Sequence, residues 1–513
     1  MPIGRPHSKK GIVAAGHEET AKAAAEILSD GGNAYDAVVA ALVASCIPET
    51  VLASLGGGGF LMARRADDPV PRLYDFFAQT PKRKLELTDS LEFFGIEADF
   101  GPATQEFHIG AASAAVPGLI PGIFHIHREL CSLPLQRIFE PAVRLAREGV
   151  PVTEFHAYLF TIITPILTAT EKSRNYFCKD GRIMQAGDVY RNPELANTLE
   201  QLVREGLAFF THGELGQAIA AQSDHGKGHL TLTDLQDYKV IERAPLICDY
   251  KGHEIAFNPA PAASGPLIAF GLNLFQKLRP DYSEPTPLEL ALILSETNAF
   301  RKKQNQYAPD QFDRELSDHL SRIKSHWSFS RGTTHISVID GDGNAAAATV
   351  SNGEGNGNIV ADFGIMLNNM LGEEDINPEG FHNWPLNSRL STMMSPTLIT
   401  QANTNKLIAL GSGGSNRIRT AILQVIFNLI DGQMNIADAV SAPRLHLERD
   451  GKLSLEPTFR DADKEHLLQE FSNSEVWPKP NMFFGGVHTV SMEKDGKLDG
   501  AGDLRRAGFH IKV

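Results

Sequence analysis

The stretch at residues 330–357 reads SRGTTHISVIDGDGNAAAATVSNGEGNG and contains the most informative pattern in the chain. Within it, THISVID alternates in part as a strand does, with Ile336 and Val338 on one face. GDGN is a strong turn signal and AAAATVS supplies a second strand, so the stretch predicts a β-hairpin. The hairpin opens with Gly332 and Thr333, about two-thirds of the way along the chain. Taken alone, Gly-Thr-Thr is most simply an ordinary strand start.

A second interpretation follows from the chemistry of threonine. A threonine hydroxyl is a poor nucleophile unless a base lies beside it. If the bond between Gly332 and Thr333 were cut, the new α-amino group, with a pKa of about 8, would be that base on the same residue. Evidence from the rest of the chain is needed to choose between these two interpretations, an ordinary strand start and a nucleophile released by self-cleavage.

The bulk composition indicates a soluble globular protein. The chain has 513 residues, of which 42% are hydrophobic and 21% charged, and this is enough for a large core. A net charge of −14 without any basic cluster argues against a nucleic-acid surface. No signal peptide and no apolar run of about 18 residues is visible, so we expect no membrane span and a cytoplasmic location. The cysteines are far apart, without the spacing of a zinc ribbon or a disulfide framework, and fit a reducing compartment: Cys46, Cys131, Cys178 and Cys248.

The order of elements predicts a layered fold. Residues 18–48 predict two helices separated by a Gly-Gly pair and an asparagine. Residues from about 135 to 240 are mostly helical in pattern, strands dominate from 335 to 410, and helices return around 418–440. Helices, then strands, then helices favour a layered α/β sandwich over a doubly wound sheet.

Several motifs, in order along nearly the whole chain, resemble those of the γ-glutamyltranspeptidase (glutathione hydrolase) family of N-terminal-nucleophile hydrolases. Each motif is weak alone, but together and in register they are highly specific. They are GIVAAGHEETAKAAAEILSDGGNAYDAVVAA (11–41), LGGGGF (55–60), AVPGLIPG (115–122), PAVRLAREG (141–149), LTLTDLQDYKVIERAPL (230–246), NPAPAASGP (258–266), TTHISVIDGDGNA (333–345), GIMLNN (364–369), MSPT (394–397) and GSGGSNRI (411–418).

The resemblance implies an αββα sandwich made as one precursor that cuts itself between Gly332 and Thr333. Residues 1–332 would form the large chain and residues 333–513 the small chain of one intertwined unit. Thr333 would be the nucleophile that forms an acyl-enzyme, which water or an amine then resolves. No cofactor or metal is implied.

The same resemblance assigns the groups that would assist Thr333. Ser351 matches a hydroxyl that holds the nucleophile's amine in place as the base. Gly413 and Gly414 fall in the loop whose backbone N–H groups form the oxyanion hole. The family pattern is Gly-Ser-Pro-Gly-Gly-Ser, whereas this chain has Gly-Ser-Gly-Gly-Ser-Asn. The donors are therefore either Gly413 with Gly414, or Gly414 with Ser415.

The first departure from the family concerns the substrate's carboxylate. In the family, an arginine pairs with the α-carboxylate of the γ-glutamyl group, a task that suits a bidentate guanidinium. Here the equivalent stretch is DFFAQTP (75–81), which places Phe77 at the arginine's position. Lys82 and Arg83 follow closely and could take over only if the loop were rearranged.

Other polar positions of the family's acyl pocket are also replaced. By the same resemblance, the acid that binds the substrate's amine corresponds to Glu373 or Glu374. A zwitterionic amino acid needs paired partners when it is desolvated, and this pocket offers few. The replaced substrate-binding positions are an asparagine that becomes Gly353, a glutamine that becomes Met370, and two serines that become Thr392 and Met393.

Competing patterns are weaker. LGGGGF lacks the Gly-Lys-Ser/Thr that would complete a phosphate loop. A packing role is favoured for His335 and a structural role for Arg417. His125 and His127 are two residues apart, and His17 precedes Glu-Glu-Thr. No further ligand or HExxH helix accompanies them, so a metal site is not favoured.

The sequence therefore predicts a self-processing threonine amidohydrolase or acyltransferase with an altered acyl pocket. It would act on a small-molecule amide, with water or an amine as acceptor. One alternative is a true γ-glutamyl transferase or glutathione hydrolase with a replaced carboxylate anchor. Another is a processing-dead member that serves as a binding protein.

Overall fold

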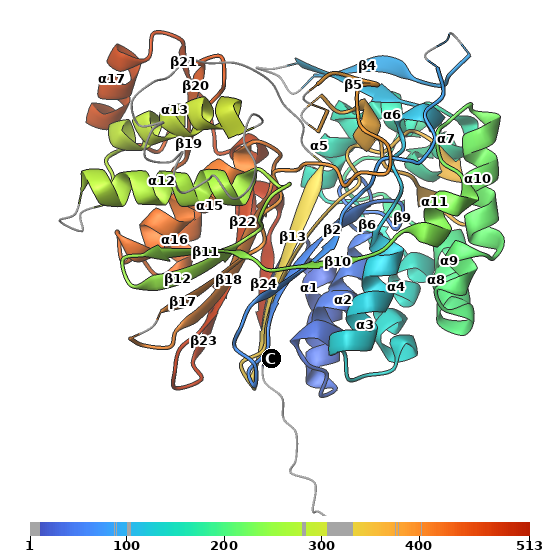
Figure 1. The fold of residues 1–513 in the computed structure, drawn as a ribbon, viewed down its shortest axis with the longest axis horizontal. Helices are drawn as coiled ribbons and strands as arrows, with labels where there is room; N and C mark the ends of the chain where they lie inside the picture. Colours follow the sequence, from blue (N-terminus) through green and yellow to red (C-terminus); the bar gives the residue numbers. More distant parts are fainter. Residues whose placement is uncertain are drawn as a thin grey trace, which may run out of the picture.

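The protein is a four-layered αββα sandwich in which two sheets pack face to face between two layers of helices (Figure 1). The computed structural model describes residues 11–86, 88, 90–99, 104–279, 284–304, 332–374, 376–377, 379–401 and 403–513. Within these ranges, no helix combines the length and the apolar character that a membrane crossing requires.

The first sheet contains the predicted hairpin at its centre. All of its pairings are antiparallel, and it draws strands from both sides of Thr333. In spatial order its strands are β10 (Ile241–Arg243), β3 (Arg72–Phe76), β2 (Gly58–Arg64), β14 (Ala345–Ser351), β13 (Thr333–Asp340), β1 (Gly11–Ala15) and β24 (Phe509–Lys512).

The second sheet is also antiparallel and also mixes the two parts of the chain. In spatial order its strands are β11 (Leu246–Tyr250), β12 (His253–Phe257), β17 (Thr397–Gln401), β18 (Leu407–Gly413), β22 (Gly486–Met492) and β23 (Leu498–Ala501).

The alternation of side chains along β13 and β14 explains why both faces of the first sheet are apolar. Ile336 and Val338 point into the core beneath the first helical layer, as the sequence predicts. On β14, Ala346 and Ala348 join that core, whereas Ala345 and Ala347 join the core that the second sheet shares. Strands buried on both faces need apolar side chains at successive positions, and small alanines let the layers approach closely.

The two helices predicted over residues 18–48 are α1 (Glu18–Ser29) and α2 (Ala34–Ser45), which confirms that interpretation. Gly31, with φ of +88°, allows the chain to reverse between them. Asn33 then starts α2 with a capping box, because its side chain accepts from the backbone of Asp36 while the Asp36 carboxylate accepts from the Asn33 backbone.

Helices cover the outer faces of both sheets (Figure 1). The first sheet is covered by α1, α2 and α3 (Leu119–Leu130), with α4 (Leu135–Glu148) packed on α2. The second is covered by α12 (Ser264–Leu278), α15 (Arg417–Ile430) and α16 (Ile436–Ser441), with α13 (Pro287–Gln304) packed on α12. Further helices are α5 (Glu154–Ile162), α6 (Thr164–Leu167), α7 (Glu171–Phe177), α8 (Pro193–Glu205), α9 (Ala208–Thr211), α10 (Glu214–His225), α11 (Leu232–Asp237) and α17 (Asp461–Glu470).

Small strands lie outside the two main sheets. They are β4 (Phe94–Asp99), β5 (Thr104–Ile109), β6 (Val150–Pro151), β7 (Cys178–Lys179), β8 (Arg182–Ile183), β9 (Val189–Tyr190), β15 (Ile359–Val360), β16 (Ile365–Met366), β19 (Leu445–Leu447), β20 (Leu453–Leu455) and β21 (Ser474–Val476).

One sequence-based expectation needs correction. Strands do not dominate throughout 335–410, because the residues that the structure describes between β14 and β17 form only the two-residue strands β15 and β16. Glycine and asparagine are frequent there, and several glycines have positive φ, including Gly353 at +61° and Gly355 at +87°. These residues favour turns over extended pairing.

Candidate active site

Thr333 is the first residue of β13 and lies opposite Ser351, the last residue of β14. The Ser351 hydroxyl donates a hydrogen bond to the carbonyl oxygen of Gly332, and it accepts one from the backbone N–H of Gly353 at 3.0 Å. The hairpin therefore places a hydroxyl donor on the carbonyl oxygen of the peptide bond that would be cut.

A small cavity of about 30 Å³ opens beside Thr333. It gathers eight of the residues that the sequence singles out: Phe77, Gly332, Thr333, Ser351, Glu373, Thr392, Met393 and Ser415. Its other lining residues are Ile376, Met394 and Ile418. Segments that are far apart in the sequence thus meet at the predicted nucleophile.

The wall of the cavity is mostly apolar, and Phe77 supplies part of it. This side chain is fully buried and stacks on Phe60 with ring centroids 5.5 Å apart. Its backbone is fixed on both sides, because its N–H donates to Asp75 Oδ1 at 3.0 Å and its carbonyl accepts from the Tyr238 hydroxyl at 2.7 Å.

The cations near Phe77 are bound to other groups. Arg389 donates to the carbonyl of Phe77 and, at 2.7 Å, to that of Lys239. Lys82 pairs with the exposed Asp237, and Arg83 donates to the carbonyl of Gly228 at 3.0 Å. The described residues that line the cavity include no lysine, arginine or histidine, so neither Lys82 nor Arg83 replaces the family's arginine in this arrangement.

The two candidate acids, Glu373 and Glu374, lie in different surroundings. Glu373 is buried and lines the cavity, whereas Glu374 is exposed. The Glu373 carboxylate lies against Gly353, where an added Cβ would come within 2.2 Å of Oε1 and 2.1 Å of Asn369 Oδ1. Met370, in contrast, is buried in the hydrophobic core and does not line the cavity.

The loop after β18 passes behind Thr333. An added Cβ on Gly413 would lie 2.1 Å from the carbonyl oxygen of Thr333, so only glycine fits there. Gly414 has φ of +125° and Ser415 has φ of +52°, and Ser415 is the member of this loop that lines the cavity. This loop therefore brings Gly413 against the backbone of Thr333 and Ser415 to the cavity, and both predicted donor pairs remain candidates for the oxyanion hole.

Arg506 is a site residue that the sequence reasoning missed. It is buried, and its Nη1 donates to the carbonyl oxygen of Thr333 at 3.1 Å. Burial and the nearby charge of Arg417 lower the pKa of Arg506 to about 10, so it stays charged at neutral pH. No local pattern marks it beyond the Arg-Arg pair at 505–506.

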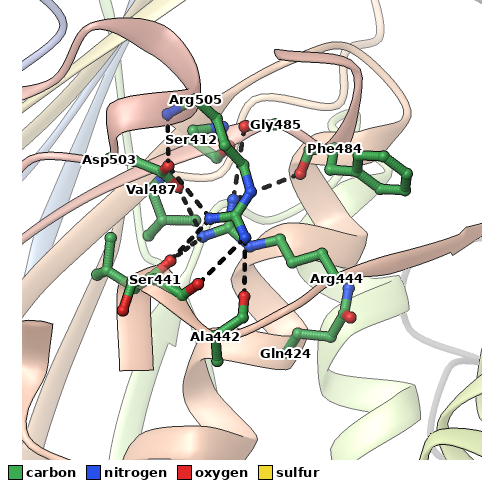
Figure 2. Close-up of polar contacts among 12 residues, drawn as sticks. Ser412, Gln424, Ser441, Ala442, Arg444, Phe484, Gly485, Val487, Asp503 and Arg505 are labelled. Carbon is green, nitrogen blue, oxygen red and sulfur yellow. Dashed lines mark hydrogen bonds and ion pairs between the residues drawn. The ribbon is translucent and has the colours of Figure 1, made fainter. Parts of the chain in front are cut away.

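A buried ionic network holds the turn that carries Arg506 (Figure 2). Asp503 pairs with Arg444 at 2.7 Å and with Arg505 at 3.3 Å, and it accepts from the backbone N–H of Val487 at 2.9 Å. Burial alone would raise the pKa of Asp503, but the charges of Arg444 and Arg505 hold it below its ordinary value. The network joins the turn to the start of β22, next to the loop behind Thr333.

Glu49 is a second residue that was missed. It is completely buried and accepts hydrogen bonds from the hydroxyl of Thr334 and, at 2.7 Å, from that of Thr20. Burial raises the pKa of Glu49 to about 7, although these hydrogen bonds and the charge of Arg506 act in the opposite direction. Glu49 therefore anchors the residue that follows the predicted nucleophile.

The structure supports packing roles for His335 and Arg417. Both ring nitrogens of His335 are hydrogen-bonded, to Thr349 Oγ1 at 2.7 Å and to Ser337 Oγ at 2.9 Å, and burial lowers its pKa well below the ordinary value. Arg417 is buried over the ring of Phe483, 4.9 Å from its centroid.

The other histidines are engaged locally. His17 caps α1 by accepting from the backbone of Glu19 at 3.0 Å, His125 contacts Glu242, and His127 bonds to the carbonyl of Leu133. Within the described ranges, no group of three or more histidine, cysteine or acidic side chains is arranged to hold a metal ion.

Comparison with known proteins assigns the family. The sequence profile described as gamma-glutamyltranspeptidase matches residues 20–326 and 292–513. The chain belongs to the gamma-glutamyltranspeptidase family. It is thus an enzyme of the N-terminal-nucleophile amidohydrolase and transferase type, which leaves the alternative of a binding protein without support.

Relatives within the gamma-glutamyltranspeptidase family cover the whole chain. The glutathione hydrolase proenzyme of Escherichia coli (strain K12) is 28% identical over 538 residues, which cover 97% of this chain and 91% of the relative. The acylase ACY 1 proenzyme of Pseudomonas sp. (strain V22) is 27% identical over 530 residues, with 98% and 94% covered. The structure of the cephalosporin acylase from Bacillus halodurans superposes with a TM-score of 0.81 at 22% identity, covering 100% of this chain and 98% of that one, and confirms the predicted sandwich.

Proposed function

We propose that the chain cuts itself between Gly332 and Thr333, and that Thr333 then attacks an amide whose acyl group is less polar than γ-glutamyl. The processed enzyme would consist of residues 1–332 and 333–513. The observation that carries this proposal is the cavity in which Gly332, Thr333 and Ser351 meet an apolar wall.

In the processed enzyme, the α-amine of Thr333 takes the proton of its own hydroxyl, and Oγ1 attacks the carbonyl carbon of the amide. Ser351 holds the amine, and the backbone N–H groups of Gly414 and of either Gly413 or Ser415 stabilise the oxyanion. The leaving amine departs with the proton, and water or a second amine then resolves the acyl-enzyme.

The lining of the cavity supports an acyl group without a free α-carboxylate. Phe77, Met393 and Met394 offer no hydrogen-bond donors to a carboxylate, and no cation is among the described lining residues. The hydroxyls of Thr392 and Ser415 also line the cavity, but neutral donors offset only part of the several kcal/mol that it costs to take a carboxylate out of water. Glu373 favours a hydrogen-bond donor or a cation on the acyl group instead.

Self-cleavage is tested by denaturing electrophoresis of the purified protein. We expect two fragments from the wild type, with Thr333 at the N-terminus of the smaller one, and an uncut chain from Thr333→Ala. A wild type that stays uncut, or a Thr333→Ala chain that is cut at the same bond, would refute the proposal.

Substrate preference is tested with a panel of p-nitroanilides bearing γ-glutamyl, 4-aminobutyryl and simple aliphatic acyl groups. We expect kcat/KM for γ-glutamyl to be lower than for the best acyl group by a factor of at least about 100, since its carboxylate is left unpaired. The second candidate, a true glutathione hydrolase, is favoured by the 28% identity to the Escherichia coli glutathione hydrolase proenzyme. Fastest release from the γ-glutamyl compound would establish it.

A further inference from the structure

Self-cleavage needs a base that the processed enzyme does not need. Before the cut, the nitrogen of Thr333 is part of an amide, which is not basic. Another group must therefore take the proton of the Thr333 hydroxyl during cleavage. The question rests on the proposed function, because it arises only if Thr333 attacks the carbonyl of Gly332.

One carboxylate lies directly against the residue that would be cut. An ideal Cβ built on Gly332 would come within 2.3 Å of Glu354 Oε2 and within 1.6 Å of the carbonyl oxygen of Gly353. Both groups therefore pack against the Cα of Gly332, one bond from the carbonyl carbon under attack.

Glu354 is held in this place. It is only 4% exposed, and its backbone N–H donates to Asn369 Oδ1 at 2.8 Å. The guanidinium of Arg506 lies close enough for its charge to interact with that of Glu354. Since Arg506 also donates to the carbonyl of Thr333, a carboxylate and a guanidinium flank the two residues of the scissile bond.

The other buried carboxylates near Thr333 have different surroundings. Glu49 accepts hydrogen bonds from the hydroxyls of Thr334 and Thr20, so it contacts the residue that follows Thr333. Glu373 lies against Gly353 and lines the cavity. Of the three, only Glu354 is among the atoms nearest to the Cα of Gly332.

We propose that Glu354 carries the proton during self-cleavage. Its carboxylate accepts the proton of the Thr333 hydroxyl as Oγ1 bonds to the carbonyl carbon of Gly332. The Ser351 hydroxyl stabilises the oxyanion that forms on Gly332. The carbon–nitrogen bond then breaks, and Glu354 returns the proton to the nitrogen of Thr333. Water hydrolyses the resulting ester, which leaves the Gly332 carboxylate and a free N-terminal Thr333.

The test follows the cutting of full-length chains made by brief cell-free translation, at several pH values. General acid–base catalysis contributes about 10²–10⁴-fold, so Glu354→Gln is expected to cut at least about 100-fold more slowly than the wild type. The wild-type rate is expected to fall as the pH is lowered, because a protonated carboxyl cannot accept the proton. We call this fall in rate at low pH the acid limb. It is expected to be lost in Glu354→Gln, and to be retained in Glu354→Asp at a reduced overall rate.

Glu448→Gln serves as the matched control, because Glu448 is also buried but bonds to His446 and does not line the cavity. It should cut at the wild-type rate. Thermal melting of each variant separates slow cutting from misfolding. Cutting of folded Glu354→Gln within about threefold of the wild-type rate, or slow cutting with the acid limb intact, would overturn the inference. Thr333→Ala tests the proposed function separately. Cleavage of the Thr333→Ala chain would show that Thr333 is not the nucleophile, whatever the cleavage rate of Glu354→Gln.

Discussion

Replacement of Glu49 by glutamine is expected to stabilise the protein in a way that depends on pH. The carboxyl is completely buried between the hydroxyls of Thr20 and Thr334. Glutamine has nearly the same shape and keeps one acceptor oxygen, while its NH₂ group can donate to a hydroxyl that turns round. The substitution therefore removes the charge and changes little else.

The size of the effect follows from the pKa of Glu49, which burial raises from 4.5 to about 7. A raised pKa means that the folded state binds the proton more tightly than the unfolded state does. Wild-type stability is therefore lost as the pH rises from about 4.5 to about 7, and the loss is complete above that range. The difference of about 2.5 pH units, at 1.36 kcal/mol per unit, corresponds to about 3 kcal/mol.

The assay is urea unfolding at pH 4.5, 5, 6, 7 and 8, with both proteins carrying Thr333→Ala so that each is a single chain. The free energy of unfolding of Glu49→Gln minus that of the parent should increase by about 3 kcal/mol between pH 4.5 and pH 8. Subtraction removes groups that titrate equally in both proteins. A difference that stays constant over this range would show that Glu49 does not carry a raised pKa, and the reasoning would fail.

Three further substitutions or measurements test the surroundings of the scissile bond and the cores. Gly332→Ala should slow fragment formation at least about 10-fold on a timed gel, because its methyl would lie 1.6 Å from the carbonyl oxygen of Gly353, and a wild-type rate would contradict this packing. Ser351→Ala removes the donor on the carbonyl of Gly332 and should slow cutting by about 10²–10³-fold, which a rate near wild type would disprove. Burial raises the pKa of the Cys46 and Cys248 thiols, so iodoacetamide at pH 8 should leave both unmodified in the folded protein, as peptide mapping would show. Rapid labelling of either cysteine would instead indicate that its surroundings open.

Local patterns were enough to predict the helical pair α1–α2 and the hairpin β13–β14. Each depends on residues close in sequence, such as Asn33 with Asp36, or the turn that ends β13. The order of strands in the sheets depends on contacts between distant segments. The pairing of β1 with β24 joins the two ends of the described chain, and no periodicity in either segment records it.

The candidate site, too, could be predicted from local sequence only in part. Thr333 and Ser351 belong to a motif and could be identified from it, and the structure places them opposite each other. Glu49 and Arg506 could not, because a glutamate or an arginine in a sequence is usually solvated. Only the folded chain shows that these two are buried beside Thr333 and Thr334, where their hydrogen bonds fix the backbone of Thr333 and the side chain of Thr334.

Phe77 and Gly353 are each fixed by close packing against different neighbours, and under the proposed function this bears on how the specificity could have changed. Gly353 leaves no room for a side chain, because Asn369 and Glu373 occupy the space where its Cβ would lie. Phe77 is buried against Phe60, so an arginine introduced there alone would place a charge in a core without a partner. Restoring one family residue at a time would therefore destabilise the site before it restored a γ-glutamyl contact. Under the proposed function, the residues at positions 77 and 353 could therefore be exchanged only together with the neighbours that pack against them.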